Sequence, residues 1–163
     1  MVGAQLEGFK RMLELSKDSE FAVIEGDEYL SSPIDRRSKF LHYRPHIAII
    51  TGIAWDHINV FPTVESYLDT FREFIDTIEQ NGTLVYCEQD KKLCNLVDEY
   101  IEKRTDINYI PYSTPHSTPG ITSNKIEFKD GTLLETQLVG EHNYQNLEGA
   151  KAICNEIGIS STE

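Results

Sequence analysis

Ile47-Ala-Ile-Ile-Thr-Gly-Ile-Ala-Trp-Asp-His57 is the stretch that decides the fold class of this chain. Its first residues form an apolar, β-branched run, which is typical of a strand buried in a parallel sheet. A second run of this kind, Phe21-Ala-Val-Ile-Glu-Gly-Asp-Glu-Tyr29, precedes it. Both runs end in acidic or imidazole side chains, and open α/β sheets bind ligands beyond the carboxyl ends of their strands. If the two strands are neighbours, Glu25 and His57 lie together there, where a carboxylate and an imidazole can hold a divalent cation that also touches a nucleotide phosphate.

Further strands and helices alternate along the chain. Strands are expected at 83–87 and 108–112, the latter toward a sheet edge because Pro111 cannot donate a ladder hydrogen bond. Apolar residues at helical spacing predict helices over about 5–15, 64–78, 91–103 and 143–156. A short helix should end before Pro45, Asn81-Gly82 should terminate the helix that starts at 64, and 113–120 should be a loop.

A β-hairpin is predicted over 125–139, around the turn Asp130-Gly131. The order of the elements therefore predicts an α/β fold: a mainly parallel sheet flanked by helices, with a small antiparallel hairpin appendage.

Composition narrows the class of protein. The 163 residues suit one domain, and 15 basic against 27 acidic side chains, a net charge of −12, argue against nucleic-acid or anionic-membrane partners. No run approaches the ~18–20 apolar residues that cross a bilayer, and Glu7 and Lys10 interrupt any secretory segment. The expected location is cytoplasmic. Cys87, Cys94 and Cys154 lack metal-ligand spacing and are interpreted as reduced thiols without a role.

Four short motifs occur in a fixed order: Val23-Ile-Glu-Gly-Asp-Glu-Tyr29, Asp35-Arg-Arg-Ser-Lys-Phe40 with His42-Tyr-Arg-Pro45, Trp55-Asp-His57, and Val139-Gly-Glu-His-Asn143 followed by Asn146. This ordered set resembles the central, ATP-binding domain of the Mur ligases, from about Gly3 to about Ile159. The Arg-Ser-Lys-Phe and Tyr-Arg-Pro strings resemble the branch of that family that recycles murein peptides.

The resemblance implies ATP and Mg²⁺ as cofactors. Glu25 and His57 match the metal-binding glutamate and histidine of the family. Asn143 and Asn146 match the asparagines on the adenine side of ATP, and His142 stands beside them. In this family ATP converts a carboxylate into an acyl phosphate that an amine then attacks, so the protein mainly aligns reactants and neutralises charge.

The implied reaction of the intact enzyme joins UDP-N-acetylmuramate to the murein tripeptide L-alanyl-γ-D-glutamyl-meso-diaminopimelate. One alternative is the ligase that adds L-alanine to the same nucleotide sugar. Another is a non-catalytic module that binds a nucleotide or a protein.

The chain also departs from the family pattern. It has no Gly-rich phosphate loop ending in Gly-Lys-Thr, and no counterpart of the flanking N-terminal and C-terminal domains. Residues 1–163 are therefore interpreted as part of a central domain, inactive alone and weak in ATP binding. The missing first strand makes self-association through an exposed sheet edge an expectation.

Basic residues supply further candidates. Arg72 lies near the place where several relatives carry a carbamylated lysine, and a role in charge stabilisation is expected of it. Arg37, Lys39 and Arg44 belong to the one dense basic cluster and are candidates for receiving an anionic substrate. The alternative is a solvated face paired to neighbouring acids.

Plainer alternatives also exist for two of the ligand candidates. Glu25 could be a solvated strand end. Asn143 could cap a helix, an interaction worth about 1 kcal/mol.

Overall fold

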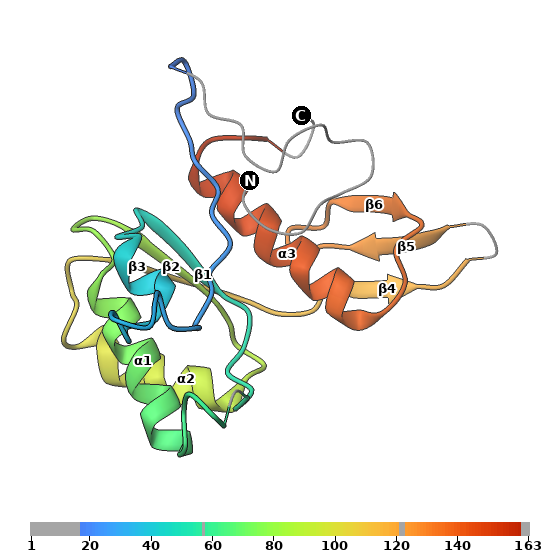
Figure 1. Cartoon of the computed structure of the whole chain (residues 1–163). Helices are drawn as coiled ribbons and strands as arrows, with labels where there is room; N and C mark the ends of the chain where they lie inside the picture. The colour runs from blue at the N-terminus through green and yellow to red at the C-terminus, as the bar shows by residue number, and fades with distance from the viewer. Residues whose placement is uncertain (1–16, 57, 121–122, 161–163) are drawn as a thin grey trace. The chain divides into compact units, whose positions relative to one another are not determined.

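A computed structural model of the chain describes residues 17–56, 58–120 and 123–160 (Figure 1). The chain divides into two compact units, residues 1–43 and 44–163. The helix predicted at 5–15 lies outside the described residues. The elements in chain order are the 3-10 helix η1 (Lys39–His42), β1 (Ile47–Ile50), α1 (Val64–Asp76), β2 (Thr83–Cys87), α2 (Lys91–Ile101), β3 (Asn108–Tyr112), β4 (His116–Thr118), β5 (Asn124–Glu127), β6 (Leu133–Thr136) and α3 (Glu141–Glu156).

The core of the second unit is a parallel sheet of three strands in the order β1-β2-β3. The central strand β2 is buried on both faces, with Leu84 and Val85 completely shielded from solvent. Strand β3 lies at the edge, as Pro111 predicts. The strand predicted from the apolar run that begins at Ile47, the predicted strands at 83–87 and 108–112 and the predicted parallel sheet are thus confirmed.

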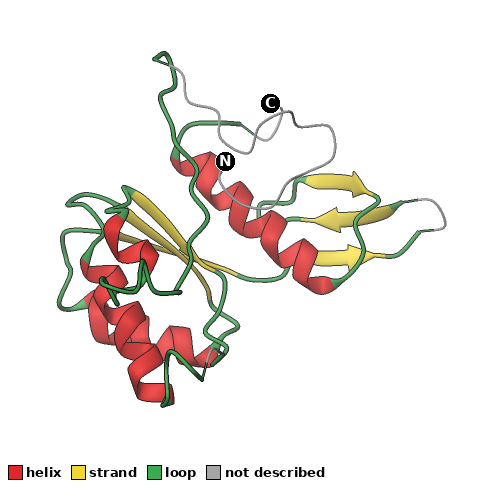
Figure 2. Cartoon of the chain, in the orientation of Figure 1, coloured by secondary structure: helices red, strands yellow, loops and turns green. Residues whose placement is uncertain are grey.

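Helices α1 and α2 cover one face of this sheet and α3 covers the other (Figures 1 and 2). Helix α1 begins with a capping box, in which Thr63 Oγ1 accepts from Ser66 N (3.1 Å) and Ser66 Oγ accepts from Thr63 N (3.3 Å). Its apolar stripe is largely aromatic: Tyr67 packs edge-on against Phe61 and Phe71, with ring centroids 5.0 and 5.1 Å apart. The apolar spacing over 64–78 therefore identifies the buried face of α1 correctly.

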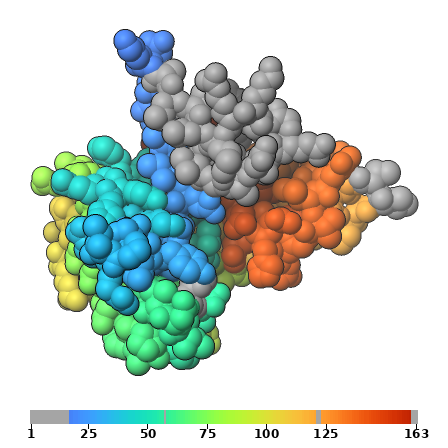
Figure 3. All heavy atoms as spheres, in the orientation of Figure 1, coloured from blue at the N-terminus to red at the C-terminus, as the bar shows by residue number. Residues whose placement is uncertain are grey.

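Helix α3 lies between the parallel sheet and a second, antiparallel sheet. A β-carbon on Gly149 would come within 2.6 Å of Ile49 Cδ1 and 3.0 Å of Tyr112 Cζ, so the helix backbone rests directly on the parallel sheet. On the other side Tyr144 packs with Ile126 of β5 and with Phe128, which directly follows that strand. In the space-filling view the residues of the C-terminal part of the chain, coloured orange to red, pack against one another (Figure 3).

The small sheet has three strands in the order β4-β5-β6. The predicted hairpin is confirmed: Gly131 takes a positive φ of 82° in the turn, and Phe128 N donates to Thr132 O at 2.9 Å. Strand β4 was not expected, because the stretch 113–120 is short and rich in Ser, Thr and Pro. Its three residues become a strand through pairing with β5, which local sequence does not encode.

The prediction of a buried strand over 21–29 is wrong. The structure assigns no strand to Phe21–Gly26, and Val23 is 75% exposed. The acidic end of the segment pairs instead with 37–40, where Lys39 N donates to Tyr29 O (2.9 Å) and Ser38 Oγ donates to Glu28 O (2.6 Å). The segment therefore closes a turn with 37–40 and does not join a sheet.

The helix terminator also differs from expectation. Asn81, and not Gly82, takes the left-handed conformation, with φ 62°. Gly82 is needed for a different reason: a β-carbon there would lie 2.6 Å from the carbonyl oxygen of His46. The loop between α1 and β2 therefore lies so close to the backbone before β1 that no side chain fits at position 82.

Candidate functional site

The carboxyl ends of β1, β2 and β3 point to one edge of the parallel sheet, which we call the carboxyl edge. It comprises the loops 51–56, 88–90 and 113–115 and the first two turns of α3. Gln145 Nε2 lies 3.3 Å from Gln89 Oε1, which places the start of α3 at this edge. At the opposite edge Thr83 Oγ1 donates to Glu156 Oε1 at 2.6 Å, so α3 runs antiparallel to the strands.

Two adjacent residues after β2 organise the carboxyl edge. Asp90 caps α2, because its Oδ1 accepts from Lys92 N (2.9 Å) and Leu93 N (3.0 Å). Its Oδ2 accepts from Ile53 N at 2.7 Å, in the loop that follows β1. Gln89 Oε1 accepts from both the backbone N (2.8 Å) and the hydroxyl (2.6 Å) of Thr114. Neither residue is among those predicted from the sequence, although an acid directly before a predicted helix is a recognisable capping signal.

The predicted adenine-side residues all lie on the first two turns of α3. His142, Asn143 and Asn146 are exposed, and Asn143 and Asn146 share a face because they are three positions apart. The Asn143 side-chain amide donates to the carbonyl oxygen of Val139 at 2.8 Å. The helix N-cap is Gly140, with φ 100° and no side-chain bond. The alternative role of Asn143 as the N-cap is therefore wrong.

The predicted metal ligands fall in different parts of the chain. Glu25 is exposed within the unit 1–43, and His57 lies outside the described residues. Asp56, which precedes it, is exposed in the loop after β1. Among the residues that the structure describes, no group of three or more His, Cys, Asp or Glu side chains could hold a metal ion. The pairing of Glu25 with His57 stays a prediction.

The basic candidates for substrate binding are each paired with one carboxylate. Arg37 binds Asp35 through two bonds of 3.0 and 2.8 Å, and this holds the pKa of the Asp35 carboxyl at about 2. Lys39 Nζ donates to Asp27 at 2.6 Å, and Arg44 Nε lies 3.0 Å from Glu79. Neighbouring acids thus balance the cluster locally, as the plainer alternative expects.

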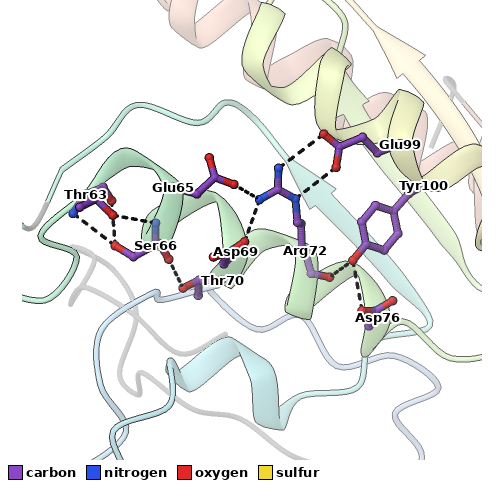
Figure 4. A network of polar contacts seen from close by, with 9 residues as sticks. All are labelled: Thr63, Glu65, Ser66, Asp69, Thr70, Arg72, Asp76, Glu99 and Tyr100. Carbon is purple, nitrogen blue, oxygen red and sulfur yellow. Dashed lines mark hydrogen bonds and ion pairs between the residues drawn. The ribbon is translucent and has the colours of Figure 1, made fainter.

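Arg72 lies at the centre of a polar network between α1 and α2 (Figure 4). Its guanidinium contacts Glu65 (2.6 Å), Asp69 (2.8 Å) and Glu99 (3.2 Å), and the side-chain bond to Glu99 is the largest cause of its raised pKa. Three acids surrounding one cation indicate a structural tie between the two helices. The catalytic role expected of Arg72 stays a prediction that these contacts do not favour.

A buried carboxylate adjoins the carboxyl edge. Glu148 of α3 is only 9% exposed, and its Oε2 has no hydrogen-bond partner among the described residues. Burial raises the pKa of this carboxyl, while the nearby Lys129 amide and the Lys151 ammonium oppose the rise. It lines a hollow of about 440 Å³ together with Thr114, Lys129 and others. Sequence periodicity alone does not distinguish such a group from a solvated helix residue.

None of the helices in the described part of the chain combines the length and apolar character that a membrane span requires.

Comparisons with known proteins identify the family. Residues 4–154 match the Mur ligase middle domain. The UDP-N-acetylmuramate–L-alanine ligase of Treponema pallidum is 30% identical over 141 residues, 80% of this chain and 29% of that protein. The UDP-N-acetylmuramate–L-alanyl-gamma-D-glutamyl-meso-2,6-diaminoheptandioate ligase of Escherichia coli is 26% identical over 152 residues, 90% of this chain and 33% of that protein. The chain thus spans about a third of the length of these relatives.

Solved structures agree on the fold. The UDP-N-acetylmuramate:L-alanyl-gamma-D-glutamyl-meso-diaminopimelate ligase from Neisseria meningitides superposes with a TM-score of 0.65 at 23% identity, over 82% of this chain and 42% of that one. The match of the middle-domain family over almost the whole chain, on a fold that its solved relatives share, shows that this chain belongs to the Mur ligase family.

Proposed function

We propose that the chain supplies the ATP-facing part of the central domain of a cytoplasmic ligase that joins UDP-N-acetylmuramate to an amine-bearing substrate. The observation that carries this proposal is the match of residues 4–154 to the Mur ligase middle domain. Members of this family are ATP-dependent ligases, and a parallel sheet with an open carboxyl edge is the usual support for a nucleotide. The proposed chemistry passes through an acyl phosphate, which an amine then attacks.

In this proposal Asn143 and Asn146 receive the adenine side of ATP, with His142 beside them. The Asn143 amide nitrogen already donates to Val139 O. Its amide oxygen can still accept a hydrogen bond, and the exocyclic amine of adenine is a suitable donor. The exposure of all three side chains on the first turns of α3 supports this role.

Glu25 and His57 are the proposed ligands of Mg²⁺. A carboxylate oxygen and an imidazole nitrogen suit a divalent cation, and the Glu25 carboxylate is accessible to solvent. When bound, the ion would offset the repulsion between the γ-phosphate and the substrate carboxylate. The chain's own contribution to the reaction is to hold and orient the nucleotide.

For the amine substrate we propose the murein tripeptide L-alanyl-γ-D-glutamyl-meso-diaminopimelate. Relatives named for this tripeptide and for L-alanine both resemble the chain, so L-alanine is the alternative substrate. Arg37, Lys39 and Arg44 could receive the anionic substrate only by exchanging their present carboxylate partners. We therefore propose these three residues as candidates for recognising the anionic substrate, and not for taking part in the chemical step.

The test starts from the coding DNA on either side of this segment, where the proposal expects a Gly-Lys-Thr loop upstream. The enzyme encoded by the full reading frame is then assayed for ADP release with UDP-N-acetylmuramate and either tripeptide or L-alanine. Asn143→Ala and Asn146→Ala should raise the KM for ATP about tenfold or more, as expected when a bound hydrogen-bonding group is lost. Absence of ADP release with both amines would favour a non-catalytic module.

The 163-residue chain alone should be inactive and should bind ATP weakly. Calorimetry that finds micromolar ATP affinity, or ligation product formed by the chain alone, would contradict this part of the proposal. Self-association is a further proposal: among the described residues β1 pairs with β2 alone. The mass of the chain in solution tests it.

A further inference from the structure

Gln89 and Asp90 are adjacent in the chain, yet their side chains reach different elements. Asp90 bonds to the loop after β1 and to the start of α2. Gln89 bonds to the loop after β3 and to Gln145 in the second turn of α3. The two residues therefore connect every loop of the carboxyl edge to the end of β2.

The Asp90 side chain does more than cap a helix. One oxygen suffices for the bonds to the amides of Lys92 and Leu93. The second oxygen crosses to Ile53 N at 2.7 Å, and Ile53 is 3% exposed. A β-carbon on the preceding Gly52 would lie 3.0 Å from this oxygen, so the loop approaches the carboxylate closely. The carboxylate of Asp90 thus joins the loop after β1 to the start of α2.

The Gln89 side chain makes an equally non-local set of bonds. Its amide oxygen accepts from Thr114 N, Thr114 Oγ1 and Gln145 Nε2 at 2.8, 2.6 and 3.3 Å. Gln145 lies between Asn143 and Asn146 in the sequence, and its amide also reaches Thr114 Oγ1 at 3.4 Å. The turn of α3 that carries these asparagines is thereby tied to β2 and β3.

We propose that Gln89 and Asp90 are the positioning residues of the nucleotide site, holding the asparagine-bearing turn of α3 and the loop after β1 in one fixed arrangement before ATP arrives. The nucleotide part of this inference rests on the proposed function. The physical gain is preorganisation: loops already held in the binding geometry lose less conformational entropy when the ligand binds. Neither residue needs to touch ATP for this effect.

Two variants test the contributions of Asp90 and Gln89 separately. Asp90→Ser keeps a capping oxygen for α2, but its shorter side chain does not reach Ile53 N. Gln89→Met keeps the length of the side chain and removes the accepting oxygen. Amide hydrogen exchange measured by NMR should become about tenfold faster at Ile53 in the first variant and at Thr114 in the second, each leaving the other amide unchanged. Gln89→Glu retains an accepting oxygen and should restore the protection of Thr114.

Thr83→Val is the matched control, because it removes a hydrogen bond between the sheet and α3 at the opposite edge. Titration of the chain with millimolar Mg-ATP, followed by amide chemical shifts, gives the affinity of each variant. Asp90→Ser and Gln89→Met should each weaken ATP binding about fivefold or more, while Thr83→Val lowers stability and leaves the affinity unchanged.

The outcomes separate the two proposals. If the unmodified chain responds to ATP at the carboxyl edge and both variants bind it equally well, the positioning role is overturned and the proposed function stands. Unchanged exchange at Ile53 and Thr114 would also overturn it. If the unmodified chain shows no response to ATP, the proposed nucleotide site fails, and this inference fails with it.

Discussion

Two segments with nearly the same apolar pattern have different environments in this molecule. Ile47-Ala-Ile-Ile forms β1, with Ala48 and Ile50 buried, whereas Phe21-Ala-Val-Ile forms no strand and exposes Phe21 by 56% and Ile24 by 48%. The first segment pairs along its length with β2. Beyond the second, the chain turns back on itself through contacts between 27–31 and 37–40. An apolar run thus becomes a strand only where another strand completes its hydrogen bonds.

The largest expected effect is on the buried sheet. Leu84→Ala removes a side chain that is fully buried in β2, and should lower the free energy of unfolding by about 2–5 kcal/mol through lost burial and an unfilled cavity. Val23→Ala, in the exposed segment, should change it by no more than about 0.5 kcal/mol. Urea denaturation of both variants measures the difference. Equal losses would mean that 21–24 is buried in solution.

Two glycines provide a second contrast. Gly149→Ala should destabilise by about 1–3 kcal/mol, because the new β-carbon meets Ile49 and Tyr112 beneath α3. Gly26→Ala, in the exposed segment, meets nothing within 4 Å and should be neutral or slightly stabilising. Thermal unfolding compares the two. A neutral Gly149→Ala would contradict the close packing of α3 on Ile49 and Tyr112.

The stability of the protein should depend on pH through Glu148. Burial raises the pKa of Glu148 in the folded protein above its unfolded value, so the folded state favours the protonated form. Its contribution to stability is complete below the ordinary glutamate pKa of 4.5, and is lost as the pH rises through the folded pKa. Glu148→Gln should flatten this part of the pH profile and stabilise the protein at neutral pH. Parallel profiles for the two proteins, measured by denaturation from pH 4 upward, would contradict it.

The smallest effect is expected at the exposed turn of the first unit. The hydrogen bonds from Arg37 lower the pKa of Asp35 from its usual 3.8 to about 2. The ion pair therefore persists to a pH below the pKa of an ordinary aspartate, and is lost as the pH falls through about 2. In Arg37→Gln the midpoint of Asp35, followed by NMR, should return toward 3.8. An unchanged midpoint would mean that the 35–37 turn is not formed in solution.

Local sequence was sufficient to predict an element where its apolar residues pack against the core. The strands 83–87 and 108–112 and the aromatic face of α1 follow from apolar spacing, because each lies against the core that the same residues build. It was insufficient where pairing with a segment distant in the sequence determines whether a strand forms. Strand β4 exists only through β5, and 21–29 closes a turn with 37–40 and is not part of a sheet.

The same limit applies to the candidate site. His142, Asn143 and Asn146 were identified through a family resemblance, and the structure places them together on the first turns of α3. Gln89 and Asp90 have no such signature, since their importance lies in bonds to Ile53, Thr114 and Gln145, which are 25–56 positions away. Only the fold brings these groups together.

The most direct test of the account is photolabelling of the chain with an azido derivative of ATP, followed by peptide mapping. The account predicts that the label attaches to the carboxyl edge, in peptides containing 139–146 or 113–116, and that excess ATP prevents the attachment. Labelling of the opposite edge, around Thr83 and Glu156, or labelling that ATP does not compete away, would contradict it.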